Sequence, residues 1–463
     1  MRNITLTMCL SICTLISVLS ARDDRYRNRN LPIDQRVEIL LKQMSLEEKL
    51  GQMQCCGAAE VDKALKEGKD LLFGNVIPHY LRRYKDPAEM AAKCNEVQKL
   101  VTGKQRLGIP LLFHDEALHG LLVNNSASYP QAIALAATWN PQLVSRVAAA
   151  IAEETRARGI RQVLSPVVNI VRDVRWGRVE ETYGEDPYLT SRLGVAFCRE
   201  FERRGVITTP KHYIANVGDG GRDSNIVHFS ERLLREIYFP AFHACIREGG
   251  ARSIMAAYNA VDGIPCSAND WLLTEILRKE WGFRGIVVSD YGSVKGIMSK
   301  HHTAANPVEA AAQAVEAGLD IEFPKSEIFR NGLRKAVTSG RLPVRLIDQA
   351  VRRILRVKFE IGLFDEPFAD PQKAKALADC PAHRALAREA CRQSIVLLKN
   401  RNRILPLDRK KIRKVALLGP RAREIYLGGY SGRGTRKVTI EEGIRAKLGK
   451  DAEIRILEGA DLS

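Results

Sequence analysis

Residues 285–292 read GIVVSDYG, and this stretch decides the fold class that the sequence predicts. Ile286, Val287 and Val288 are apolar on both faces of an extended chain, which is typical of a strand buried in a parallel sheet. The run passes directly into Ser289 and Asp290, so a carboxylate stands where the strand gives way to a loop. The role of Asp290 therefore depends on which other side chains the neighbouring strands bring to it.

Strand and helix patterns of the same kind alternate from Ile109 onward, as they do in repeated parallel βα units. Asn140-Pro141 and Asn306-Pro307 supply a cap and a first-turn proline for helices, and Gly159 and Gly318 end them. No GxGxxG follows the first strand, which argues against a dinucleotide-binding sheet. The sequence thus predicts an α/β fold of the (β/α)8 barrel type. The expected strands lie at 111–113, 162–170, 206–209, 253–258, 285–290 and 319–323.

The chain divides into four expected segments. Residues 1–21 form a signal peptide, 22–370 the barrel, 371–387 a linker and 388–463 the start of an α/β sandwich domain. Within the last segment a helix runs into SIVLLKN, followed by the strand pattern VALLGP and the glycine-rich stretch GGYSG. The second domain is therefore expected to be only partly present.

The expected signal peptide has a basic residue, Arg2, before an uncharged apolar run that ends in small residues. This run is too short and too early for a membrane span, and no other segment reaches about 18 uncharged apolar residues. The sequence predicts a secreted or periplasmic protein that does not engage a membrane.

Composition argues against a disordered chain, a nucleic-acid-binding protein and a zinc protein. The 463 residues are 45% apolar, so the chain can build a large core, and its formal net charge is +18. Lysines and arginines are scattered along amphipathic helices and not gathered in one block, which favours a basic solvated surface over a nucleic-acid partner. Cysteine spacing matches no zinc motif and defines no disulfide framework, and Cys94, Cys198 and Cys245 are expected to be small buried residues.

Polar clusters follow the predicted strands. Because the carboxyl ends of barrel strands meet on one face, these clusters are expected to converge there. Acids beside Lys, Arg and His side chains can hydrogen-bond a polyhydroxylated ligand. Cations near Asp290 are also expected to lower its pKa, which suits a nucleophile. The clusters are HDEALHG (114–120), RDVRWGRVEETYGEDP (172–187), KHYIAN (211–216), YNAVDG (258–263) and SDYG (289–292).

The sequence resembles glycoside hydrolase family 3, of the β-glucosidase and β-xylosidase type, from about Gln35 to its last residue. The motifs are specific in combination: RWGRVEETYGEDPYL, KHYIAN, AAYNAVDGIPCSAN, GFRGIVVSDYG and SIVLLKN. The resemblance implies that Asp290 is the nucleophile and that Tyr291 stands where members often carry an aromatic platform. It implies that the sugar is held by Glu116, Arg178, Lys211, His212 and Tyr258.

The implied activity is that of a retaining, exo-acting β-glycosidase. It would release terminal non-reducing β-D-glucosyl or β-D-xylosyl residues through a covalent glycosyl-aspartate, with a β-linked oligosaccharide or glycoside as partner and no cofactor or metal. His119 is expected to pack beneath the site, and Asp115 to point away from it. An N-acetylhexosaminidase is disfavoured, because the loop after His212 lacks the histidine of that branch.

A retaining enzyme also needs a second acid about 5–5.5 Å from the nucleophile. The resemblance implies a glutamate on the sandwich domain, beyond the end of this chain. The late glutamates Glu441, Glu442, Glu453 and Glu458 are better explained by helix and strand structure. The alternative prediction is therefore a truncated, catalytically impaired sugar-binding protein.

Overall fold

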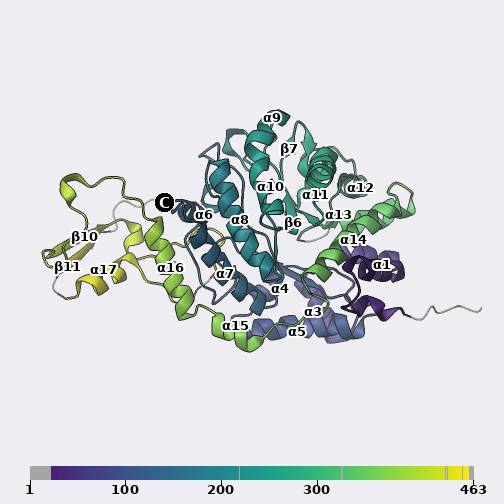
Figure 1. The fold of residues 1–463 in the computed structure, drawn as a ribbon, viewed down its shortest axis with the longest axis horizontal. Coiled ribbons are helices and arrows are strands. Elements are labelled where there is room, and N and C mark those ends of the chain that lie inside the picture. Colours follow the sequence, from purple (N-terminus) through teal and green to yellow (C-terminus); the bar gives the residue numbers. More distant parts are fainter. Residues whose placement is uncertain are drawn as a thin grey trace, which may run out of the picture.

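The computed structural model describes residues 22–217, 219–324, 327–432, 434, 436–450 and 452–457. The signal peptide expected at 1–21 lies outside these residues. Figure 1 shows a large body in which helices surround short strands, and a smaller lobe that contains the last strands and the last helix. No helix in the described part of the chain is long and apolar enough to cross a membrane.

Short parallel strands form the wall of the large body. Five of them pair in chain order: β1 (Cys55–Cys56), β2 (Asn75–Val76), β3 (Leu112–Asp115), β4 (Gln162–Val163) and β5 (Ile207–Thr208).

The rest of the wall closes the circle. Tyr213, just after β5, bridges to Ala256 in β6 (Ser253–Ala256), and β6 pairs in parallel with β9 (Ile286–Ser289). Val288 of β9 bridges to Ile321, and the N–H of Glu322 donates to the carbonyl of Met53, 3.2 Å away and just before β1. The predicted (β/α)8 barrel is confirmed.

Several predicted strands are shorter than expected, and two of them are much shorter. Only Gln162 and Val163 of the run 162–170 are in a regular strand, because Pro166 has no N–H to give to a ladder. The run 319–323 contributes a single bridge at Ile321. The sequence analysis did not predict β1 and β2, whose two residues each are too few to show a pattern.

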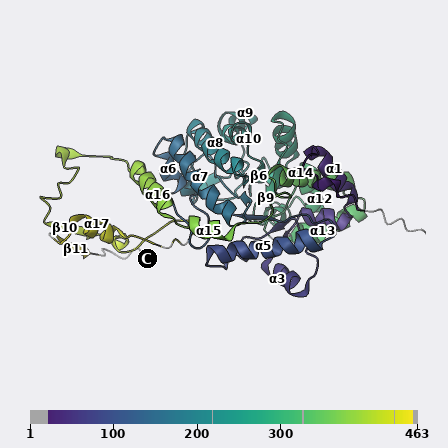
Figure 2. The same cartoon turned by 60° about the horizontal axis from the view of Figure 1, so that its bottom comes forward.

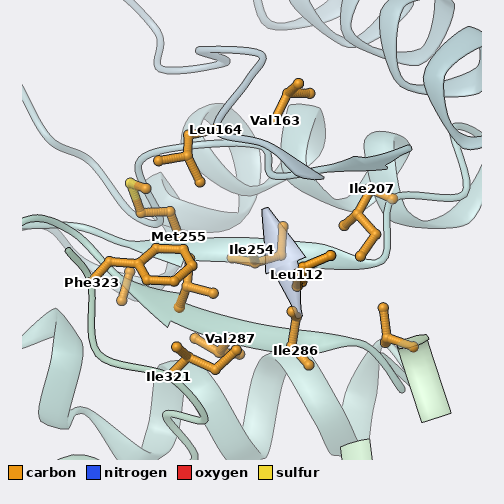
Figure 3. Close-up of a cluster of buried hydrophobic side chains, with 14 of the residues drawn as sticks. Leu112, Val163, Leu164, Ile207, Ile254, Met255, Ile286, Val287, Ile321 and Phe323 are labelled. Carbon is orange, nitrogen blue, oxygen red and sulfur yellow. The ribbon is translucent and has the colours of Figure 1, made fainter. Parts of the chain in front are cut away.

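Apolar side chains from the strands fill the barrel (Figure 3). Leu112, Ile207, Ile254 and Ile286 come from different strands, and each is at most 1% exposed. Branched aliphatic residues of this kind are the usual filling of such barrels. The strand ends above this core are thus held in place by tight packing.

The helices start and stop where the sequence predicted. Asn140 accepts the N–H of Leu143 and begins α7 (Pro141–Ala157). Asn306 caps α12 (Pro307–Ala317), which ends at Gly318 with a φ of 112° that favours glycine. The remaining helices of the barrel are α1 (Ile33–Gln43), α2 (Leu46–Gln52), α3 (Ala58–Glu67), α4 (His79–Arg82), α5 (Pro87–Lys104), α6 (Ala132–Ala136), α8 (Pro187–Arg203), α9 (Glu231–Leu233), α10 (Phe239–Arg247), α11 (Ser293–Ser299), α13 (Glu327–Thr338) and α14 (Val344–Glu360), with π-helical turns at Leu234–Tyr238 and Trp271–Glu280.

The segment expected as a linker, 371–387, is helical. It holds α15 (Pro371–Leu377) and the first half of α16 (Pro381–Ser394), which pack on the barrel helices α5 and α7. Beyond them, β10 (Lys414–Leu418) and β11 (Glu453–Leu457) pair in parallel beside α17 (Ile440–Leu448). Figures 1 and 2 place this lobe at the end of the molecule opposite α1.

Candidate active site

Asp290 lies at the carboxyl end of β9, and its residue is only 6% exposed. Its Oδ1 accepts the N–H of Tyr291 at 2.6 Å. Its Oδ2 lies 3.4 Å from Nε2 of His212 and has no hydrogen-bond partner among the described residues. One carboxylate oxygen is thus held by the backbone, and the other faces His212.

Burial raises the pKa of Asp290, although Lys211 and Arg178 pull it down. The sequence analysis predicted a lowered pKa, and that direction is wrong. The cations are present as expected, but the cost of desolvating the buried carboxylate outweighs their attraction. Asp290 therefore needs a higher pH to ionise than an exposed aspartate does.

Glu116 follows β3 and forms a buried ion pair with Lys211. The Nζ of Lys211 lies 2.8 Å from both carboxylate oxygens of Glu116. Burial raises the pKa of Glu116 to about 7, and the charge of Lys211 opposes this rise. Asp115, next in sequence, points away and pairs with Arg82, its Oδ1 3.0 Å from the arginine Nε.

His212 is oriented by Asn169, a residue that the sequence analysis missed. Nδ2 of Asn169 donates to the carbonyl of His212 at 3.0 Å, and Oδ1 of Asn169 accepts the backbone N–H of His212 at 2.8 Å. That same Oδ1 lies 3.0 Å from Nδ1 of the ring, which places the ring hydrogen on Nδ1. Burial, Arg178 and Lys211 lower the pKa of His212, so its Nε2 is a bare acceptor facing Asp290.

Arg178 is also fixed before any ligand binds. Its Nε and Nη2 each donate at 2.8 Å to a different oxygen of Glu181. Its Nη1 lies 3.6 Å from Oδ2 of Asp223, whose other oxygen accepts from Trp176 at 3.1 Å and from Asn216 at 2.9 Å. A bidentate pair of this kind holds the guanidinium plane in one orientation.

The two tyrosines of the predicted site are both partly buried. Tyr258 is half-buried, and burial together with the charge of Asp290 raises its pKa, so its hydroxyl keeps its proton. Its carbonyl lies 2.9 Å from Nε2 of His301. The hydroxyl of Tyr291 is enclosed, with no hydrogen-bond partner among the described residues. Its role as a platform stays a prediction.

Tyr430 reaches this site from the C-terminal segment. The Nζ of Lys211 lies 5.1 Å from the centroid of its ring, within the range of a cation–π contact. Burial and the charge of Glu116 raise the pKa of Tyr430. The sequence analysis noted its motif, GGYSG, only as part of the second domain, since nothing in a local pattern shows which barrel residue a distant loop will meet.

The structure thus brings together every sugar-contacting residue that the sequence predicted. A buried carboxylate is surrounded by a lysine, an arginine, a neutral histidine and a protonated tyrosine. Among the residues that the structure describes, no three His, Cys, Asp or Glu side chains gather as metal ligands. The arrangement is suited to a ligand rich in hydroxyl groups and to attack by Asp290 on it.

Comparison with known families agrees with this geometry. The model of the glycosyl hydrolase family 3 N-terminal domain matches residues 45–357, and that of the family 3 C-terminal domain matches residues 395–462. The chain belongs to glycosyl hydrolase family 3. The first match covers the whole barrel wall, and the second covers the lobe with β10 and β11.

Curated relatives of the chain carry related names. A β-xylosidase from Formosa agariphila is 38% identical over 402 residues, which are 80% of this chain and 55% of the relative. A periplasmic β-glucosidase from Salmonella typhimurium is 34% identical over 449 residues, 93% of this chain and 56% of the relative. The chain spans about half the length of these curated relatives.

Solved structures of β-glucosidases have the same fold. A β-glucosidase from Erythrobacter marinus superposes with a TM-score of 0.88 at 35% identity, covering 95% of this chain and 60% of that one. A β-glucosidase from Listeria innocua in complex with glucose superposes with a TM-score of 0.81 at 33% identity. The match covers 93% of this chain and 61% of that one.

Proposed function

We propose that this chain is a retaining, exo-acting β-glycosidase that releases terminal β-D-glucosyl or β-D-xylosyl residues. The observation that carries the proposal is the buried Asp290, whose carboxylate lies beside Lys211, Arg178, His212 and Tyr258. The names of the family 3 relatives, β-xylosidase and β-glucosidase, support the same substrate class.

In the proposed reaction, Oδ2 of Asp290 attacks the anomeric carbon of the terminal sugar. The bond from that carbon to the leaving oxygen breaks, and the leaving oxygen takes up a proton. Water then attacks the same carbon, gives up a proton and releases Asp290 as a carboxylate. The neutral Nε2 of His212 accepts a hydrogen bond from a sugar hydroxyl, while Lys211 and Arg178 donate to others.

The substrate is proposed to enter with its non-reducing end toward Glu116 and Lys211. This ion pair is buried at the ends of β3 and β5, and it is proposed to form a closed floor for the pocket. A closed floor admits one terminal sugar, which favours exo action. The paired Glu116 carboxylate can accept from sugar hydroxyls without losing its contact to Lys211.

A mechanism-based label tests the proposal. A 2-deoxy-2-fluoro glucoside or xyloside with an activated aryl leaving group should attach to Asp290, adding mass to the peptide that contains 285–292. Asp290→Asn should not label. Asp186→Asn is the matched control: Asp186 caps α8 through the N–H of Leu189, and Asn caps equally well. A folded chain that labels elsewhere, or not at all, contradicts the assignment.

We also propose that the protein is exported with loss of about the first 20 residues. The basic Arg2, the apolar run and the small residues at its end support this. Mass spectrometry of the N-terminus of the protein made in its own cells is the test. Retention of Met1 or Arg2 would overturn the proposal.

A further inference from the structure

A loop of the C-terminal segment, residues 427–432, is docked onto the barrel beside the candidate active site. Gly429 is held through both its backbone groups. Its N–H donates to Oε1 of Glu180 at 2.8 Å, and its carbonyl accepts from Nε2 of Gln131 at 2.9 Å. Gln131 also donates to the carbonyl of Leu427 at 3.3 Å.

The loop approaches so closely that a side chain has little room at its glycines. A Cβ on Gly428 would lie 2.4 Å from Nε2 of Gln131. A Cβ on Gly432 would lie 2.4 Å from Oγ of Ser126 and 2.7 Å from the carbonyls of Leu121 and Val123. Backbone carbonyls block a Cβ at Gly432, so only glycine permits the approach there, whereas at Gly428 the end of the Gln131 side chain could move aside.

His119 joins the two sides of this contact. Its Nδ1 lies 2.8 Å from the carbonyl of Tyr129 in the barrel. Its Nε2 lies 3.1 Å from the carbonyl of Gly429 and 3.3 Å from Oγ of Ser431, both in the loop. The ring is buried (1% exposed), and within the described part of the chain it makes no hydrogen bond to Asp290 or Lys211. Its Nε2 therefore contacts the loop, while its Nδ1 is held by the barrel.

Tyr430 stands between the two loop residues that contact His119. Its φ of 54° directs the side chain out of the turn, and its ring lies over Nζ of Lys211, 5.1 Å from the centroid. The position of this ring over the sugar-binding lysine thus depends on how the loop is anchored. Glu180 anchors the same loop from the motif that also contains Arg178.

We propose that His119 is a positioning residue. It holds loop 427–432 against the barrel, so that Tyr430 closes the sugar pocket over Lys211. The inference rests on the proposed function, because it assigns the loop to the pocket of that function. The docking itself does not require activity and can be tested separately.

The docking test is hydrogen exchange on the full chain, followed by mass spectrometry of peptides that contain 427–432. His119→Phe keeps the ring but removes both nitrogens. It should raise exchange in this loop about tenfold, the equivalent of about 1.4 kcal/mol, and leave β9 protected. Glu180→Leu should also raise exchange in the loop. Glu180→Gln keeps an acceptor for the N–H of Gly429, so the loop of that variant should exchange as it does in the wild type.

A control variant separates loop docking from general loosening of the second domain. Glu389 in α16 forms a bidentate pair with Arg146 in α7, 2.7 Å for each bond, and does not touch the loop. Glu389→Ala should leave loop exchange unchanged. Unchanged exchange in both His119→Phe and Glu180→Leu, in chains whose circular dichroism melts are normal, would overturn the docking role.

The functional arm measures kinetics with an activated aryl glycoside. His119→Phe should raise KM about tenfold with a smaller change in kcat, because it loosens a wall of the pocket and leaves Asp290 in place. Tyr430→Ala should do the same, and the double variant should be no worse than either single variant. Additive losses would overturn the link between His119 and Tyr430. If no variant or wild type turns over any glycoside while the exchange results hold, the docking stands and the proposed function fails.

Discussion

The Nζ of Lys211 lies 2.8 Å from both oxygens of Glu116, although 95 residues separate them in sequence. Both side chains are buried, so neither charge is solvated without the other. Removal of one partner from a buried pair typically costs about 3–5 kcal/mol, more than the loss of the pair as a whole. The pair is therefore both a binding surface and a constraint on stability.

A double-variant cycle tests this pairing. Glu116→Gln and Lys211→Met should each lower the free energy of unfolding by about 3 kcal/mol, because each leaves a buried group without its charge partner. The double variant should be less destabilised than the sum of the two. Urea unfolding at pH 8 is the measurement. Strict additivity would show that the charges do not interact.

The pH dependence of sugar binding follows from Glu116. With a pKa of about 7, this carboxyl takes up a proton as pH falls through 7, and its ion pair with Lys211 is lost. Affinity for glucose or xylose should therefore decrease on the acid side of pH 7. Glu116→Gln has no such proton and should show a flat profile there in calorimetric titrations. An equally steep profile in that variant would exclude Glu116 as the titrating group.

Turnover should depend strongly on the leaving group. Each described glutamate after residue 387 already pairs with an arginine or caps a helix, as shown by the contacts of Glu389, Glu424, Glu441, Glu442 and Glu453. Proton donation contributes typically 10²–10⁴-fold, so if none of these glutamates acts as the acid, disaccharides should react that much more slowly than activated aryl glycosides. Asp290→Asn should abolish both reactions. Disaccharide turnover of about 1–10³ per second would show that an acid acts in this chain.

Lys358 makes stability depend on pH in the alkaline range. Its buried Nζ donates to Oε1 of Gln52 at 2.8 Å and to the carbonyls of Gly74 and Pro110 at 3.0 and 2.9 Å. Burial lowers its pKa to about 7, whereas the unfolded chain holds this proton up to about 10.4.

Between these values the unfolded state binds more protons. The contribution of Lys358 to unfolding free energy should therefore rise with pH by up to about 1.4 kcal/mol per unit. Lys358→Met should remove this slope while it keeps most of the side-chain volume. Urea melts of both proteins at pH 7.5 and 9.5 measure the difference. Parallel slopes would show that Lys358 keeps its charge when the protein folds.

Local patterns in the sequence were sufficient to predict the barrel and to place Asp290 at the end of one of its strands. Ile286, Val287 and Val288 are apolar in succession, which indicates a strand that is buried on both faces. Asp290 follows this strand directly, so it was expected at the carboxyl end of the sheet. The same reasoning located Glu116, Lys211, His212 and Tyr258. The strands β1 and β2 were missed because two residues are too short to carry a pattern.

Tertiary structure alone decided how these side chains pair and titrate. The contact of Asn169 with His212, the burial that raises the pKa of Asp290, and the loop that brings Tyr430 over Lys211 each depend on segments far apart in sequence. Sequence specifies which groups are present, since side-chain chemistry and strand periodicity are local. Distances and desolvation are set by the packed chain as a whole, and they determine which charge each group carries.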